Sequence, residues 1–297
     1  MSRATTTKGL SYWFWLVIIG ALFAAQLYAY SIYSRDQRYL QKVMDWIASP
    51  VLPPSEQVLH VLDYLREKPV ITNDSYFFLP IFGFMRATSR EIDEQGGDCA
   101  DRARLMITLL NLRGIRASKW ALYSPRSFPR HAVVQVDTEK GQMVADGLYG
   151  LVYPRPGGGY YGIADLQHTP TLVPQRIHEL EERRQEPGAT PLEQYPLDTY
   201  VYAHARSINW DKTDATLVLY RLLHATLGDR VNQLVRPKWV EQPALMFIFG
   251  LGALQIFVLF AWFVSTRWRR LLTSRNVNKT NTFGSREVNS PAQPIAQ

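Results

Sequence analysis

Cysteine is almost absent from this chain, since Cys99 is the only one among 297 residues. A single cysteine cannot form an internal disulfide and cannot complete a CxxC redox or zinc motif. No two histidines have the HExxH spacing, and no GxGxxG segment follows a predicted strand. We therefore expect no metal site and no other cofactor, so that any chemistry must come from side chains.

Charged residues are missing from two long runs, 10–33 and 243–265. Each run exceeds the roughly 20 residues with which a helix crosses about 30 Å of hydrocarbon, and each has Trp or Tyr near an end, as interfacial anchors would be. The first run could also be a cleaved signal peptide. It is longer than the usual apolar region of a signal and has no Ala-x-Ala at its end, so we expect a retained anchor.

Basic residues beside the second run predict the orientation in the membrane. Four arginines follow it directly, which marks the C-terminal side as cytoplasmic. Two spans put both termini on that side, so we expect a two-pass protein of a bacterial inner membrane with a periplasmic central domain. Much of the net charge of +7 lies beside the runs, where the lipid bilayer explains it. A nucleic-acid partner is not expected, because no basic helix face carries interleaved aromatics.

These features predict six consecutive segments. They are a cytoplasmic tail (1–9), a transmembrane helix (10–33), a folded domain (34–163), a helical extension (164–242), a second transmembrane helix (243–265), and a basic, disordered cytoplasmic tail (266–297).

The spacing of apolar residues in the central domain indicates an α+β fold. A helix is expected over 55–68, with Ser55 as its cap, and an irregular segment with an aromatic patch over 70–94. A second helix begins at Cys99 after a capping Asp98 and carries a broad apolar stripe, so it should be central and largely covered. Strands are expected over 117–123, 131–137 and 142–148, the last two forming a hairpin that turns at 138–141. Further along, an apolar helix is expected over 215–227 and a linker over 190–196.

The position of Cys99 favours a nucleophilic thiol. The partial positive charge of a helix N-terminus stabilises an anion there. Gly96 and Gly97 would leave room for a substrate backbone, and the Cys99 N–H is a candidate oxyanion donor. Gln95 is a second, weaker candidate for that donor, and Gly97 a weak candidate for the substrate cleft.

His131 and Asp146 are the candidate base and the group that orients it. Their side chains share one face of the predicted hairpin. If 137 pairs with 142, Asp146 lies diagonal to His131, and if the register shifts by two residues, Asp146 lies directly opposite. Either register brings the two Cβ atoms within about 4.5–8 Å.

Three blocks of sequence resemble the signature blocks of the transglutaminase-like superfamily: GGDCADRARLMITLLNLRGIRA (96–117), RHAVVQV (130–136) and MVADGLYG (143–150). The resemblance covers about 50–163. It implies a papain-like α+β domain, in which a central helix packs on an antiparallel sheet. It also implies that Cys99, His131 and Asp146 form a catalytic triad in this order.

The expected function is therefore cysteine-dependent acyl transfer on a peptide or protein substrate near the membrane. Whether water accepts the acyl group, as in a cysteine peptidase or amidase, or an amine does, as in a transglutaminase, stays open at this point. The alternative is a catalytically inactive transglutaminase-like module that binds or organises partners in cell-envelope or surface-polymer assembly.

Overall fold

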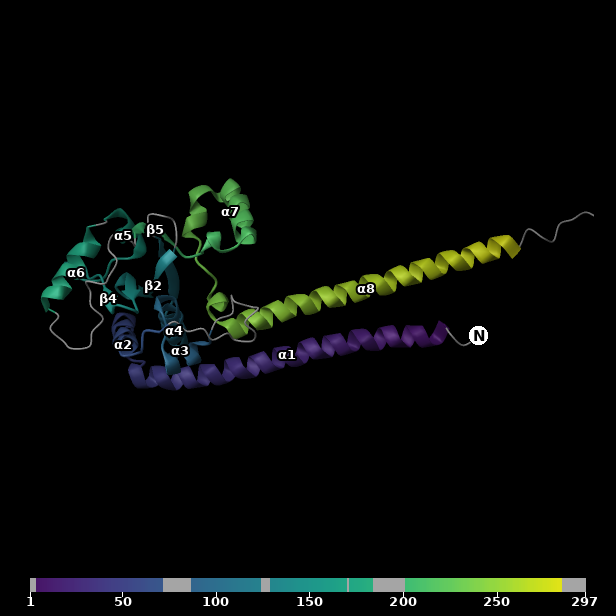
Figure 1. Ribbon diagram of the computed structural model, residues 1–297, viewed down its shortest axis with the longest axis horizontal. Coiled ribbons are helices and arrows are strands. Elements are labelled where there is room, and N and C mark those ends of the chain that lie inside the picture. Colours follow the sequence, from purple (N-terminus) through teal and green to yellow (C-terminus); the bar gives the residue numbers. More distant parts are fainter. Residues whose placement is uncertain (1–3, 72–86, 124–128, 170, 184–200, 285–297) are drawn as a thin grey trace, which may run out of the picture. The chain divides into compact units, whose positions relative to one another are not determined.

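The computed structural model describes residues 4–71, 87–123, 129–169, 171–183 and 201–284 (Figure 1). The chain divides into two compact units. One consists of Met1–Ala29 with Phe247–Gln297, and the other is Tyr30–Met246. The second unit contains Cys99, His131 and Asp146.

The first unit contains most of the two charge-free runs. They lie in α1 (Ala4–Ile47) and α8 (Pro243–Gly284), and both helices are long and apolar enough to cross a membrane. Within the unit, Gln26 Nε2 donates to the Ile248 carbonyl oxygen at 3.4 Å.

Both helices run beyond the two charge-free runs. The segment after residue 33 continues α1 without a break, because the first proline after this run is Pro50. The C-terminal segment was expected to be disordered, yet α8 continues to Gly284. No proline interrupts 266–284, so nothing in the chain forces the helix to end earlier.

A five-stranded sheet forms the centre of the second unit. Its strands are β1 (Ala117–Tyr123), β2 (Pro129–Thr138), β3 (Gly141–Asp146), β4 (Leu151–Val152) and β5 (Val201–Arg206). They lie in the order β4-β3-β2-β1-β5, and every neighbouring pair is antiparallel. The predicted α+β class with an antiparallel sheet is confirmed.

The β2–β3 hairpin adopts the first of the two registers considered. Asp137 pairs with Gln142, and Val134 pairs with Ala145. Gly141 closes the turn with a φ of +96°, in the region that favours glycine. This register puts the end of β3 diagonal to the start of β2.

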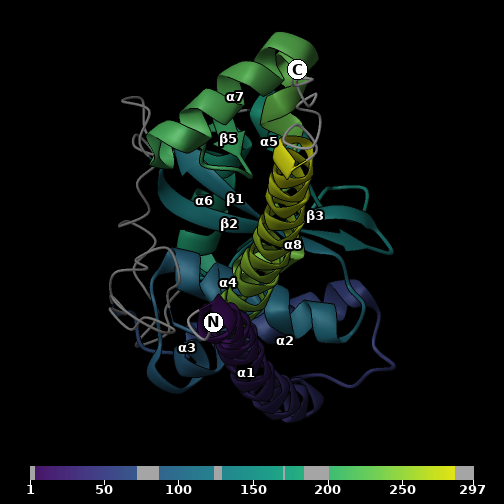
Figure 2. The same cartoon turned by 90° about the vertical axis from the view of Figure 1, so that its right-hand side faces the viewer.

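One face of the sheet is covered by α2 (Pro54–Arg66) and α4 (Cys99–Leu112), and in Figure 2 both helices lie on the same side of β1 and β2. Every residue of α4 from 101 to 110 is buried. The apolar side chains of this core interdigitate between the helices and the strands, and include Leu62, Leu65, Leu105, Leu109, Val134, Val136 and Met143.

The other face of the sheet is covered by α5 (Ile163–His168) and α6 (Leu172–Arg183). Their core includes alternate strand residues such as Val133 and Val144, as a pleated sheet requires. The segment 164–242, expected to be a helical extension, also supplies β5. This strand pairs with the outer edge of β1, whose backbone groups would otherwise lack partners.

Two local predictions differ from the structure. Ser55 does not cap α2, because the cap position is Pro53 and Ser55 is hydrogen-bonded to Glu139 through both its N–H and its hydroxyl. The segment 70–94, expected to be irregular, contains α3 (Ser89–Gln95), which begins with a capping box formed by Thr88 and Glu91. The aromatic patch at 76–78 and the linker at 190–196 lie outside the described residues.

Candidate active site

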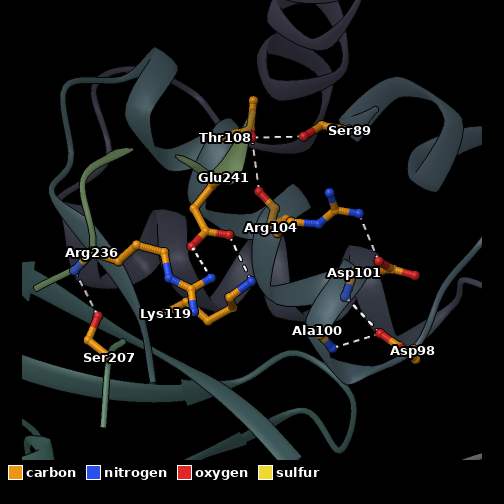
Figure 3. Close-up of polar contacts among 10 residues, drawn as sticks. All are labelled: Ser89, Asp98, Ala100, Asp101, Arg104, Thr108, Lys119, Ser207, Arg236 and Glu241. Atoms are coloured by element: carbon orange, nitrogen blue, oxygen red, sulfur yellow. Dashed lines mark hydrogen bonds and ion pairs between the residues drawn. The ribbon is translucent and has the colours of Figure 1, made fainter. Parts of the chain in front are cut away.

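The N-terminus of α4 presents Cys99. The Asp98 carboxylate caps the helix by accepting the amides of Ala100 and Asp101, both at 2.9 Å (Figure 3). The Cys99 amide is not one of the two that Asp98 accepts, and its side chain is partly buried as the first residue of the helix. The thiol therefore lies at the positive end of a well-capped helix.

His131 and Asp146 form a buried pair at neighbouring strand ends. His131 Nε2 lies 2.6 Å from Asp146 Oδ2, and the residues are 3% and 0% exposed. The other carboxylate oxygen, Oδ1, accepts the amides of Leu148 and Tyr149 at 3.0 and 3.1 Å. The turn after β3 thus fixes the carboxylate, and the carboxylate fixes the imidazole ring.

Cys99 is a neighbour of the imidazole, since it is one of the groups that raise the pKa of His131. The structure therefore brings the three predicted residues together in the order thiol, imidazole, carboxylate.

Three influences act on the pKa of His131. Burial lowers it, whereas the charge and hydrogen bond of Asp146 and the neighbouring Cys99 raise it. The net result raises the pKa of His131 to about 10. At neutral pH the ring is therefore held as an imidazolium, paired with the Asp146 carboxylate.

Tyr149 packs on the histidine and was not identified from the sequence. The centroids of its ring and the His131 ring are 5.4 Å apart, and its amide also binds Asp146. A single residue thus restrains both partners. The only signal available was its position three residues after the aspartate.

Arg102 is a second residue that the sequence pattern did not single out. Its buried guanidinium donates to the carbonyl oxygens of Leu65 at the end of α2 (2.7 Å), Gly97 in the loop before α4 (3.2 Å) and Gly147 in the turn after β3 (3.4 Å). Burial lowers the pKa of Arg102, and the nearby carboxylate at the end of β3 raises it. This side chain ties the loop that carries the thiol to the turn that carries the carboxylate. The signal was a charged residue, one of three in the first half of a helix expected to be largely covered.

The residues just before Cys99 have structural reasons for their identity. Gly96 has a φ of +96°, and a Cβ there would lie 2.3 Å from the Pro69 carbonyl oxygen. At Gly97 a Cβ would lie 2.5 Å from that of Asp101, and the Gly97 amide donates to Pro69. Gly97, expected to leave room for a substrate, is instead buried against the first turn of α4. Gln95, the candidate oxyanion donor, is exposed at the end of α3.

A second buried cluster of charges lies elsewhere in the same unit. Lys119 of β1 and Arg236 both contact the Glu241 carboxylate, at 2.8 and 3.1 Å, as Figure 3 shows. Glu241 belongs to η5 (Lys238–Glu241), and the Arg236 amide donates to Ser207 Oγ at 3.0 Å. The cluster therefore fastens the segment before α8 to the sheet.

Within the described part of the chain, no group of three or more His, Cys, Asp or Glu side chains is placed to hold a metal ion. No family model, curated protein or solved structure matches this chain. The chemistry of the site must therefore be argued from its own geometry.

Proposed function

We propose that the protein is a cysteine-dependent acyl transferase or hydrolase acting on peptide or amide bonds, with Cys99 as nucleophile, His131 as acid and base, and Asp146 as the group that orients His131. The single observation that carries the proposal is the buried 2.6 Å contact between His131 and Asp146, with Cys99 as a further neighbour of the same ring. A buried, fully oriented imidazole beside a thiol at a helix N-terminus is the arrangement that thiol catalysis requires.

The first chemical step forms a thioester. The thiolate of Cys99 attacks the carbonyl carbon, the C–N bond breaks, and the leaving amine takes the proton from the His131 imidazolium. The second step reverses these roles. Water or an amine attacks the thioester carbonyl and gives a proton to His131, and the C–S bond breaks to return the thiolate. We favour water as the acceptor, which makes the protein a peptidase or amidase.

The transglutaminase-like, papain-like identity of the domain belongs to this proposal. It is supported by the three sequence blocks and by a mixed α+β unit in which α4 packs on an antiparallel sheet. Two helices long and apolar enough to cross a membrane support its placement as a two-pass protein of the inner membrane. In that placement the catalytic unit is periplasmic, both termini are cytoplasmic, and the substrate is a membrane-proximal peptide or protein.

Alkylation of Cys99 by iodoacetamide at pH 6.5 tests the site, and the labelled atom is unambiguous because there is only one cysteine. We expect His131→Ala to slow alkylation by about 10²-fold or more, since the imidazole holds the thiol's proton. His204→Ala is the matched control, because His204 is exposed on β5 of the same sheet. Equal rates in the wild type and His131→Ala would contradict the proposal.

Turnover is tested separately, with fluorogenic peptide amides and with a fluorescent primary amine as acyl acceptor. Release of the amide or incorporation of the amine, lost in Cys99→Ser, distinguishes hydrolysis from transfer.

The alternative function is a binding or scaffold module for envelope or surface-polymer assembly. It is favoured by the burial of His131 and Asp146, which leaves the half-buried thiol as the exposed part of the triad. A reactive thiol without turnover would support this alternative.

A further inference from the structure

The helix α7 (Asp214–Leu227) exposes apolar side chains that a water-facing helix normally buries. None of its residues is buried, and Val218, Leu219 and Leu222 are 54%, 47% and 64% exposed. An amphipathic helix on a protein surface turns its apolar stripe toward the core. Here the stripe faces outward.

The exposed apolar residues of α7 form one continuous stripe. Ala215, Val218, Leu219 and Leu222 have the spacing i, i+3, i+4, i+7 that places side chains on one face of a helix, and all four are exposed. A different side of α7 faces the protein, where the Tyr220 ring packs on Trp210 with centroids 5.8 Å apart. The stripe is therefore free to meet something outside the folded unit.

The chain that follows α7 leads directly to the second apolar helix. Only the fifteen residues 228–242 separate Leu227 from Pro243, the first residue of α8. That connection exposes further apolar side chains, Leu234, Val235 and Trp239, and exposed basic residues, Arg230 and Lys238. Apolar, tryptophan and basic side chains together are the composition of segments that lie at the surface of a bilayer.

We propose that α7 lies in the surface of the phospholipid bilayer, with the stripe Ala215, Val218, Leu219 and Leu222 among the upper acyl chains. The inference rests on the membrane placement proposed above and is independent of the catalytic chemistry. Lipid is the favoured occupant because the same chain enters an apolar, membrane-length helix so soon after α7. Docking α7 on the bilayer would hold the catalytic unit close to the membrane and restrict its substrates to membrane-proximal ones.

The test measures the depth of single nitroxide labels on the full-length chain. In a Cys99→Ser background, Leu222→Cys carries the label on the stripe, and His224→Cys, an exposed residue of the same helix lying off the stripe, is the control. Each protein is reconstituted into vesicles of phosphatidylethanolamine with a minority of phosphatidylglycerol. Collision rates with dissolved oxygen and with a water-soluble nickel chelate then give the depth.

We expect the label at 222 to lie about 5–10 Å below the lipid phosphates and the label at 224 to face water. A label at 222 that is as accessible to nickel as the label at 224 would overturn the inference. Shielding from both reagents would also overturn it, in favour of a protein partner or a second copy. Leu219→Cys repeats the measurement in case the label at 222 perturbs the helix. Failure of the chain to float with the vesicles would instead refute the membrane placement, so the two failures are distinguishable.

Discussion

The second unit buries two acid–base pairs on the same sheet, and only one of them resembles a catalytic site. His131 and Asp146 join β2 to β3 at 2.6 Å, and Lys119 and Glu241 join β1 to η5 at 2.8 Å. Both pairs are largely shielded from solvent. Burial and short distance alone therefore do not identify a functional site.

The pairs differ in their third partner. The third partner of His131 is a partly buried thiol at a helix N-terminus, whereas the third partner of Glu241 is another cation, Arg236. Their pKa values also move in opposite directions. Burial lowers the pKa of Lys119 to about 8 despite Glu241, but Asp146 and Cys99 outweigh burial and raise the pKa of His131 to about 10. One arrangement holds a charged imidazolium next to a thiol, and the other joins the segment before α8 to the sheet.

Neutralising each acid in turn tests most directly whether the two pairs differ in function. Asp146→Asn removes the charge that holds His131 protonated and oriented, and we expect the alkylation of Cys99 to slow by about 10²-fold or more. Glu241→Gln is the matched change in the other pair, and it should leave the rate within about a factor of two. The measurement is the iodoacetamide rate constant of each folded protein. Similar losses in both variants would mean that the rate reports general loosening of the unit rather than the triad.

The parts of this site that the sequence predicted are those with local signals. The turn of a hairpin and the alternation of its side chains restrict its register, and these two features are sufficient to put His131 and Asp146 on one face. Likewise, Asp98 and the apolar stripe that follows Cys99 predicted a capped, buried helix, and both features are present. Capping and periodicity act within a few residues, so they can be read from a short stretch of chain.

The parts that were missed depend on distant segments. Pairing of β5 with β1 joins residues about eighty positions apart, and no local pattern specifies it. Arg102 interacts with backbone carbonyls of α2 and of the turn after β3, which become neighbours only after folding. By contrast, the capping box of α3 at Thr88 and Glu91 was a local signal that the prediction of an irregular segment overlooked.

Arg102 links the loop before Cys99 to the turn after Asp146 without belonging to either pair. Arg102→Met leaves at least three buried carbonyl oxygens without their donor. Each carbonyl that stays unsatisfied should lower the free energy of unfolding by about 1–3 kcal/mol. Loosening of the loop and the turn should also slow the alkylation of Cys99 by up to about 100-fold. Arg102→Lys keeps the charge but not the fork of donors, and should recover only part of both losses.

The matched control for Arg102 is Arg104→Met on the same helix. Arg104 is also buried, and its partner is Asp101 at 2.8 Å rather than the loop or the turn of the site. We expect the thermal stability of this variant to fall comparably while the alkylation rate of its folded fraction is unchanged. If Arg102→Met and Arg104→Met slow alkylation equally, Arg102 has only a structural role.

The smallest expected effect is the pH dependence of stability, in which the two pairs should act with opposite signs. The pKa of His131 in the folded state, about 10, lies above its ordinary value of 6.5. The contribution of His131 to the free energy of unfolding is therefore complete below pH 6.5 and is lost as the pH rises through 10. For Lys119 the folded pKa, about 8, lies below 10.5, so folding is favoured increasingly as the pH rises from 8 to 10.5. Each slope is at most about 1.4 kcal/mol per pH unit for one proton.

Thermal unfolding of the Cys99→Ser chain between pH 6 and 10.5 measures these slopes without a titrating thiol. This chain loses the influence of Cys99 on His131 but keeps the charge and hydrogen bond of Asp146, which are the larger causes that raise the pKa of His131. Adding His131→Gln should flatten the fall in stability between 6.5 and 8, where Lys119 stays charged in both states and contributes no slope. Adding Lys119→Met should steepen the fall between 8 and 10, because it removes the only rising contribution of the two pairs. Groups common to all three proteins cancel in the differences between curves. If the two substitutions changed the slope in the same direction, the opposite pKa shifts on which the contrast between the pairs depends would be wrong.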